Sequence, residues 1–383
     1  MAIHFTLEEF DQRKQNTLEQ MQRRGLDGLL MFRQESMYYL TGYDSFGYVF
    51  FQCLFLGADG HLMLLTRTPD LRQARHTSII KDIRIWVDRS DATPAKDLKF
   101  VLTEFGCQGK RLGVEYDAYG LTAKNGKMLE NEFADFCTFE DASDLVSKLR
   151  VVKSPAEMQY VRKAAELADL AYDEAYGLAG PGVDEGDILA AMQGVIFSGG
   201  GDYPGNEFII GSGEDALLCR YKSGRRKLDK KDQLTLEWAA AYRHYHAAMM
   251  RTIPIGIATD RHKKMHAVTV DAMGACKEAL KPGRPIGEVF DAYARTCDAA
   301  GMQDHRLNAT GYSLGTTFSP NWMDWPMFYH GNPVIAEPNM VFFLHMILMD
   351  SDSNHATCFG YTVVVNENGC ETLSRRPLDL VVK

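Results

Sequence analysis

Apolar and polar positions in the first 150 residues alternate between helical and strand periods. An amphipathic opening helix ends at Gly25, a residue type common just after helix C-termini. The short apolar run at residues 28–32 predicts a buried strand. Residues 50–56 and 62–65 predict a strand pair, because a turn signal at residues 58–60 separates them. This part of the chain is therefore expected to be an α/β domain with a mixed sheet.

A helix start marks the predicted domain boundary. Ser154 can cap the helix, Pro155 suits its first position, and Glu157 completes a capping box. Apolar residues then recur at helical spacing, at Met158, Val161, Ala165, Ala168 and Ala171. We therefore predict two domains, residues 1–150 and residues 151–383.

The second part of the chain contains an internal echo. A Gly-Pro-Gly turn at residues 180–182 precedes a helix at 188–197, and a Lys-Pro-Gly turn at residues 281–283 precedes a helix at 286–297. This similarity predicts two related helix, loop, helix units. Further strands are predicted at residues 234–238, 341–349 and 361–365, which are strand-like.

Composition and charge restrict the classes of partner. The 383 residues are 45% hydrophobic and 24% charged, which is ordinary for a globular protein of two domains. The net charge of -9 disfavours nucleic acid and anionic membranes, since both require a basic surface. A small-molecule or protein partner is expected instead.

Targeting signals and cysteine motifs are missing from the sequence. We expect neither a membrane helix nor a secretion signal, because no apolar run is long enough and residues 1–9 are polar and acidic. The protein is thus predicted to be cytoplasmic. Its eight cysteines form no CxxC pair, so they are predicted to be reduced thiols that pack as small apolar residues.

Three segments resemble the creatinase, prolidase and methionine-aminopeptidase superfamily, the pita-bread proteins of peptidase class M24. They are residues 149–168 (LRVVKSPAEMQYVRKAAELA), 234–252 (LTLEWAAAYRHYHAAMMRT) and 363–374 (VVVNENGCETLS). The resemblance implies a creatinase-type α/β domain followed by an α+β pita-bread domain with pseudo-two-fold symmetry. That symmetry agrees with the internal echo.

The resemblance breaks at the metal ligands. Peptidases of this superfamily hold two divalent metals with two aspartates, one histidine and two glutamates. The corresponding positions here, in order, are Glu237, Ala248, Tyr312, His345 and Gly360. Alanine and glycine have no side-chain donor, and Glu237 with His345 cannot form an oxygen-rich cage for two hard cations. No metal and no other cofactor is therefore expected.

Four segments are similar to ectoine hydrolases, a branch of the superfamily that works without metal. They are GGDYP at residues 200–204, the glutamate and YRHYH stretch at 237–246, NATGYSLG at 308–315 and SPNW at 319–322. A further run at residues 41–44 looks like a loop that reaches the partner subunit's pocket in the wider family, which implies a homodimer.

The ectoine-hydrolase resemblance implies a chemistry. Ectoine is a cyclic amidine whose ring carbon between two nitrogens is electrophilic, and Glu237 is implied to be the nucleophile that attacks it. His246 and His345 are candidates for proton transfer, because imidazole titrates near neutral pH. Tyr312 and Tyr242 are candidates for hydrogen bonds to developing charge.

Substrate binding has its own candidates, each with a structural alternative. Arg220 replaces the family's substrate-facing histidine and suits a substrate carboxylate, although a surface ion pair is an alternative. Trp322, Trp325 or Tyr43 would suit a flat ring, but they also suit core or dimer packing. Asp202 suits substrate binding or a turn.

Alternatives remain open for the catalytic candidates as well. Glu237 would be costly to bury without a partner, which favours function, but it could be a relic paired with Arg243 or Arg251. His246 and His345 could equally be core histidines bonded to backbone carbonyls. The leading hypothesis is a metal-independent hydrolase of a non-peptide C–N bond. A non-catalytic binding module is the second hypothesis, and an Xaa-Pro peptidase is the third.

Overall fold

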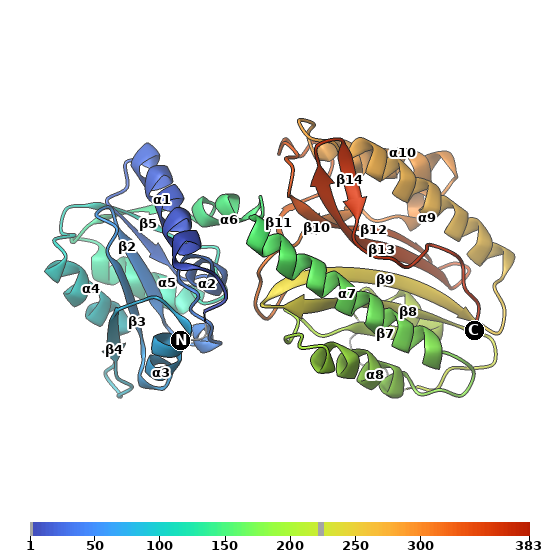
Figure 1. The fold of residues 1–383 in the computed structure, drawn as a ribbon, viewed down its shortest axis with the longest axis horizontal. Coiled ribbons are helices and arrows are strands. Elements are labelled where there is room, and N and C mark those ends of the chain that lie inside the picture. The colour runs from blue at the N-terminus through green and yellow to red at the C-terminus, as the bar shows by residue number, and fades with distance from the viewer. Residues whose placement is uncertain (1–2, 221–225) are drawn as a thin grey trace. The chain divides into compact units, whose positions relative to one another are not determined.

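The chain forms two compact units, Met1–Arg150 and Val151–Lys383. The structure is a computed structural model that describes residues 3–220 and 226–383. Figure 1 shows a helix-covered sheet in each unit. Within the described ranges, no helix has the length and apolar run that crossing a membrane requires. All eight cysteines are free thiols, and most of them are buried.

The first unit is an α/β domain with a mixed sheet. Its strands lie in the order β4-β3-β2-β1-β5-β6. β1 pairs antiparallel with β2 and parallel with β5, which makes the sheet mixed as predicted. The elements are α1 (Leu7–Arg24), β1 (Gly28–Met31), α2 (Gln34–Thr41), β2 (Cys53–Gly57), β3 (Leu62–Arg67), α3 (Thr68–Thr77), β4 (Asp82–Trp86), α4 (Pro94–Glu104), β5 (Arg111–Val114), α5 (Ala123–Phe133), β6 (Thr138–Asp141) and α6 (Leu145–Arg150).

The central strand β1 is apolar on both faces because helices cover both faces of the sheet. Leu29 and Met31 pack into a core that also contains Met21 of α1 and Leu145 of α6. Leu30 packs into the opposite core, with side chains of α4 and α5. A continuous apolar run is the pattern expected for such a doubly covered strand.

The second unit is built on one antiparallel sheet. Its strands lie in the order β11-β10-β12-β13-β9-β8-β7, and β14 pairs with β13. The elements are α7 (Pro155–Leu178), α8 (Glu185–Ser198), β7 (Ile209–Ser212), β8 (Asp232–Tyr242), β9 (Tyr245–Ile255), α9 (Asp260–Ala279), α10 (Gly287–Ala299), β10 (Gly311–Ser313), β11 (Asp324–Met327), β12 (Val341–Asp350), β13 (His355–Asn366) and β14 (Gly369–Thr372).

The second unit consists of two similar halves. In the first half, α7 packs against α8 and lies on the β8–β9 hairpin. In the second half, α9 packs against α10 and lies on the β12–β13 hairpin. The repeated helix, loop, helix pattern of the sequence corresponds to these halves. The predicted capping box at the start of α7 also forms, with Ser154 and Glu157 each bonded to the other's backbone N–H.

The long helices cover one face of this sheet. The indole of Trp238 on β8 donates to the carbonyl of Ala168 on α7 at 3.0 Å, so the even-numbered residues of β8 face the helices. On β12, Leu344 and Met346 pack into the core shared with α9. Because side chains alternate along a strand, Glu237 and His345 both face the opposite side of the sheet.

Candidate active site

Glu237 and His345 lie in one row across the sheet. Glu237 on β8 pairs with Met250 on β9, Met250 pairs with Gly360 on β13, and Gly360 pairs with His345 on β12. Each half of the unit thus contributes one polar side chain to the same face. Met250 and Gly360 separate the two along this row.

The sheet curves strongly around this face. Tyr312 on β10 lies four strand positions from β8, and a flat sheet would separate these two backbones by roughly 19 Å. Nevertheless, the Tyr312 hydroxyl donates to Oε1 of Glu237 at 3.3 Å. An isolated bridge between Tyr245 and Thr316 also joins the two sides of the sheet. The face that bears Glu237 is therefore concave.

Burial dominates the electrostatics of Glu237. Removal from water raises the pKa of this carboxyl to about 7, while the hydrogen bond from Tyr312 and the positive charge of Arg220 act in the opposite direction. A carboxyl with a pKa near neutrality is poised to exchange its proton at physiological pH. Glu237 therefore has the character of a reactive group and not that of a solvated surface glutamate.

Tyr312 is held in place by Trp322. The indole Nε1–H of Trp322 donates to the Tyr312 hydroxyl oxygen at 2.8 Å. Burial raises the pKa of Tyr312 well above its usual value, so the hydroxyl keeps its proton and can donate it in a hydrogen bond. Trp322 is only 1% exposed and stands behind Tyr312, where it supports the tyrosine. The structure does not present it as an open wall for a substrate ring.

His345 faces the concave side as a neutral imidazole. Burial lowers its pKa to about 4, and its side chain is 7% exposed. Its Nδ1 atom is buried without a hydrogen bond to another residue. A buried ring nitrogen without such a partner is unusual, because buried polar atoms are nearly always satisfied. His345 therefore has an atom available to a ligand.

His246 is placed differently from His345. It shares the face of Glu237 but lies four residues further along the hairpin, roughly 13 Å away. Its Nε2 accepts the backbone N–H of Gly205 at 2.8 Å, and its Nδ1 lies 3.1 Å from the Thr317 hydroxyl. Because both ring nitrogens bond to these segments, His246 has the contacts of a core histidine.

The positions predicted to correspond to metal ligands do converge. Glu237, Gly360 and His345 share one row, Ala248 lies two residues from Met250 on the same face, and Tyr312 reaches Glu237. Their donors, however, are one carboxyl, one imidazole and a protonated phenol. Among residues 3–220 and 226–383, no three His, Cys, Asp or Glu side chains are grouped to hold a metal ion. The side chains present do not fit a dinuclear metal centre.

Arg243 and Arg251 were considered as ion-pair partners of Glu237, but neither accounts for the presence of this carboxyl in the strand. Arg251 pairs with Leu236 in register and therefore faces the helix side, where it donates to the carbonyls of Met250 and Gly360 at 2.8 Å each. Arg243 is part of the hairpin turn at the end of β8. Arg220 is exposed, yet its charge acts on both Glu237 and His345, so it lies close to the site.

Asp202 supports the β8–β9 turn. Its carboxylate accepts the backbone N–H of His244 at 3.1 Å, and its own N–H donates to Ala241. The turn residues Arg243 and His244 have φ of 52° and 63°, which non-glycine residues rarely adopt. Tyr242 ends β8 beside this turn. These two substrate-binding candidates therefore lie at the tip of the hairpin, away from the row of Glu237.

The remaining aromatic candidates lie elsewhere. Tyr43 is fully buried in the first unit, where its hydroxyl donates to the Gln52 side chain at 3.3 Å. Its contacts are those of a core residue. Trp325 on β11 is 39% exposed. Phe343, in contrast, was not predicted, although it packs between Tyr312 and His345. An apolar residue in an apolar strand gives no sequence signal.

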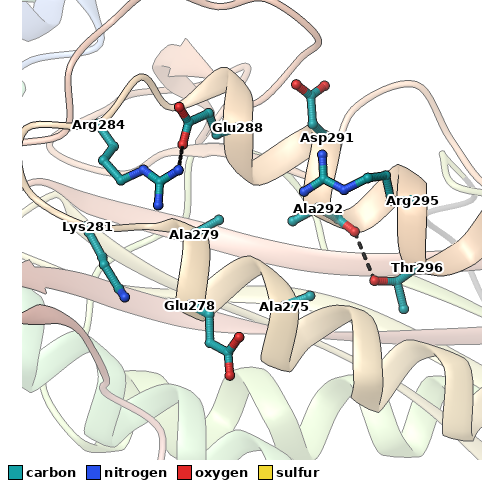
Figure 2. Close-up of a pocket in the computed structure, with 10 residues that line it drawn as sticks. All are labelled: Ala275, Glu278, Ala279, Lys281, Arg284, Glu288, Asp291, Ala292, Arg295 and Thr296. Carbon is teal, nitrogen blue, oxygen red and sulfur yellow. Dashed lines mark hydrogen bonds and ion pairs between the residues drawn. The ribbon is translucent and has the colours of Figure 1, made fainter.

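A separate groove lies on the helix side, between α9 and α10. It has a volume of ≈ 820 Å³ and is lined by Lys281, Arg284, Arg295, Glu278, Glu288 and Asp291 among others. Figure 2 shows the Arg284–Glu288 ion pair on its wall and charged groups of both signs around it. These groups are not connected to Glu237 or His345, because α9 and α10 cover the opposite face of the sheet.

Comparison with known proteins gives matches over nearly the whole chain. Residues 159–367 match the model of metallopeptidase family M24, and residues 13–152 match the creatinase/prolidase N-terminal domain. An ectoine hydrolase of Halomonas elongata is 26% identical over 100% of this chain and 99% of its own. An uncharacterised hydrolase/peptidase of Sinorhizobium fredii is 28% identical over 100% of this chain and 99% of its own.

Solved structures agree with the fold. A prolidase from Thermococcus sibiricus superposes with a TM-score of 0.88 at 19% identity, covering 98% of this chain and 99% of that chain. The dipeptidase PepE from Mycobacterium ulcerans superposes with a TM-score of 0.86 at 22% identity, covering 99% of each chain. The predicted creatinase-type and pita-bread architecture is confirmed. The chain belongs to metallopeptidase family M24 and carries a creatinase/prolidase N-terminal domain.

Proposed function

We propose that this member of family M24 is a metal-independent hydrolase that opens a non-peptide C–N bond in a small cyclic amidine, such as ectoine, or in a related amide. One observation carries the proposal. The half-buried carboxyl of Glu237 accepts a hydrogen bond from Tyr312 on the same concave face as His345, whose buried Nδ1 has no hydrogen-bond partner, and no three His, Cys, Asp or Glu side chains among the described residues are grouped to hold a metal ion. The full-length similarity to an ectoine hydrolase supports the substrate class.

Glu237 acts as the nucleophile in the proposed reaction. Its carboxylate oxygen bonds to the ring carbon that lies between two nitrogens. The bond from that carbon to one ring nitrogen then breaks, and this nitrogen leaves with a proton. Water adds to the same carbon, and the bond to Glu237 breaks to regenerate the carboxylate. The net change is the addition of one water across one C–N bond, in two easier steps.

The environment of Glu237 suits a cationic substrate ring. With a pKa of about 7, the carboxyl is partly protonated at neutral pH. A protonated amidine that binds beside it stabilises the ionised form, because an opposite charge within a few Å lowers a carboxyl pKa. Substrate binding therefore produces the nucleophile, and the positive charge of the bound amidine makes its ring carbon electrophilic.

Neighbouring side chains orient the substrate and the water. Tyr312 donates to Glu237 in the free protein, and its hydroxyl can donate to the adduct when the carboxylate oxygen bonds to carbon. His345 is uncharged and offers an unpartnered ring nitrogen, so it can accept a hydrogen bond from the attacking water. Arg220 is the proposed partner of a substrate carboxylate. His246 is left out of the proposed proton transfer because both its nitrogens are bonded.

Two other functions, a peptidase and a non-catalytic binding module, can be distinguished from the proposed one. An Xaa-Pro peptidase is favoured by similarity to an Xaa-Pro dipeptidase of Pyrococcus furiosus, which is 23% identical over 66% of this chain. Such a peptidase requires a metal centre that the described side chains do not fit. A non-catalytic binding module is compatible with the fold but gives no reason for a carboxyl of raised pKa on the same face as a histidine whose buried Nδ1 has no hydrogen-bond partner. Turnover separates these functions from the proposed one.

The test is proton NMR of ectoine with purified protein in excess chelator. We expect ring opening by the parent and none by Glu237→Gln. Glu185→Gln is the matched control, because Glu185 is a buried glutamate of the same unit at the start of α8. Ring opening only after a divalent metal is added would overturn metal independence. No ring opening under either condition would remove ectoine as the substrate, and the same comparison with small amides would then test the wider substrate class.

A further inference from the structure

Three aromatic rings pack together on the concave face. The Phe343 ring lies 5.5 Å from that of Tyr312 and 5.4 Å from that of His345, measured between centroids. The Tyr312 and His345 rings are themselves 5.7 Å apart. Phe343 is fully buried, so it contacts its neighbours on all sides. Two side chains of the candidate site therefore share Phe343 as a neighbour.

Gly360 provides the space that Phe343 occupies. A Cβ atom at position 360 would lie 2.7 Å and 2.8 Å from two carbons of the Phe343 ring, and 2.9 Å from the Leu344 carbonyl oxygen. Real Cβ atoms do not approach other atoms this closely, so any side chain at 360 would displace the ring or the strand. Gly360 is not needed for a positive φ, since it lies in regular strand β13. It is needed for room.

We propose that Phe343, seated over Gly360, is a positioning residue that acts together with the Trp322 hydrogen bond to fix Tyr312, and that also fixes His345, relative to Glu237. The Phe343 ring fills the space beside both side chains. Neither Tyr312 nor His345 can therefore adopt a second side-chain position on that side. The same packing occupies the place where a side chain at 360 would stand, so this chain cannot regain a ligand there by a single substitution. The proposal deepens the proposed function, since it concerns the same site.

Its test is the titration of Glu237 without substrate, which separates it from the chemistry. NMR of glutamate-labelled protein, with Glu237→Gln to assign the signal, gives the pKa of the carboxyl. Phe343→Leu removes the ring but keeps the site apolar, so the Tyr312 hydroxyl loses its fixed position and its hydrogen bond. We expect the measured pKa of Glu237 to rise by about 1, as in Tyr312→Phe. The double variant, Phe343→Leu with Tyr312→Phe, should show no further rise in the pKa of Glu237 beyond that of either single variant.

Phe342→Leu is the matched control. Phe342 is the next residue on the same strand and is equally buried, but it faces the helix side and packs against Phe328. It should lower stability by a similar amount and leave the pKa of Glu237 unchanged. An equal pKa change in Phe342→Leu, or a change in Phe343→Leu that adds to that of Tyr312→Phe, would overturn the positioning role.

Gly360→Ala tests the same role without altering Phe343. The added methyl group pushes the ring toward Tyr312 and His345, so the pKa of Glu237 should again rise. A parent-like pKa in both Gly360→Ala and Phe343→Leu would contradict the proposal. If the pKa changes as expected but no variant or parent opens a C–N bond, the positioning role stands and the proposed reaction fails.

Discussion

At the scale of single residues, Glu237, His246 and His345 differ in how their polar atoms are bonded. A glutamate within an apolar strand is conspicuous because burial of a carboxylate is costly. The two histidines were not distinguishable, since both occupy positions that face the same side of the sheet. Only the structure shows that the backbone N–H of Gly205 binds His246 and that the buried Nδ1 of His345 has no hydrogen-bond partner.

Glu237 makes stability depend on pH. Its pKa is about 7 in the folded protein against 4.5 for an ordinary glutamate, so the folded state holds a proton that the unfolded chain releases between these values. The free energy of unfolding therefore falls as pH rises through this window and stays lower above it. Glu237→Gln should be more stable than the parent at about pH 8, by about 2–3 kcal/mol, and should lose this advantage at about pH 4. Urea unfolding at both pH values measures it, and a constant difference would contradict the assignment.

The same group predicts the pH dependence of activity. The nucleophile must be ionised, so kcat/KM should fall as pH drops below about 7 in the free enzyme. Tyr312→Phe removes a hydrogen bond to the carboxylate, so its profile should move toward higher pH. A rate profile that is flat from about pH 5 to pH 8 would show that Glu237 is not the group that must ionise.

At the scale of elements, local signals predicted helix starts but not the strained turn of the β8–β9 hairpin. The capping box of α7 and the glycine cap of α1 follow from residue types that satisfy helix ends. The two-residue turn at Arg243 and His244 contradicts turn preferences, which favour Asn-Gly. Asp202 from a distant loop supports that turn, a tertiary contact that no local pattern reveals.

Asp202 is accordingly predicted to matter for stability and not for substrate binding. Asp202→Ala removes the acceptor of the His244 N–H, so the free energy of unfolding should fall by about 1–2 kcal/mol. KM should stay within about twofold of the parent, because the substitution removes no contact with the substrate. Denaturant unfolding and steady-state kinetics of the variant measure both quantities. A large rise of KM with unchanged stability would restore Asp202 as a substrate-binding residue.

At the scale of the whole molecule, the fold could be predicted because it repeats. The two helix, loop, helix units of the sequence become the two halves of the second unit, and their hairpins meet in one sheet. The curvature of that sheet is a collective property of many strands. For this reason the contact of Tyr312 with Glu237, across four strand positions, had no sequence signal.

Residues 41–43 are buried within the chain and do not form an exposed loop. The homodimer that the resemblance of residues 41–44 implies is therefore proposed through the exposed residues that follow them. Sedimentation velocity should give twice the mass of one chain across a range of protein concentrations. The exposed apolar residues Phe46, Val49 and Phe50 follow this segment directly, and we place them in the dimer interface, so Phe46→Ser should weaken the dimer. A monomer at all concentrations would contradict the proposal and would require a site completed within one chain.

Mass spectrometry of the protein in excess chelator, after rapid acid quench with ectoine in excess, tests the covalent role of Glu237. We expect a covalent adduct on the peptide that contains Glu237, formed without any divalent metal and missing from Glu237→Gln. Turnover with no adduct on that peptide, or turnover that starts only when a divalent metal is added, would contradict this expectation.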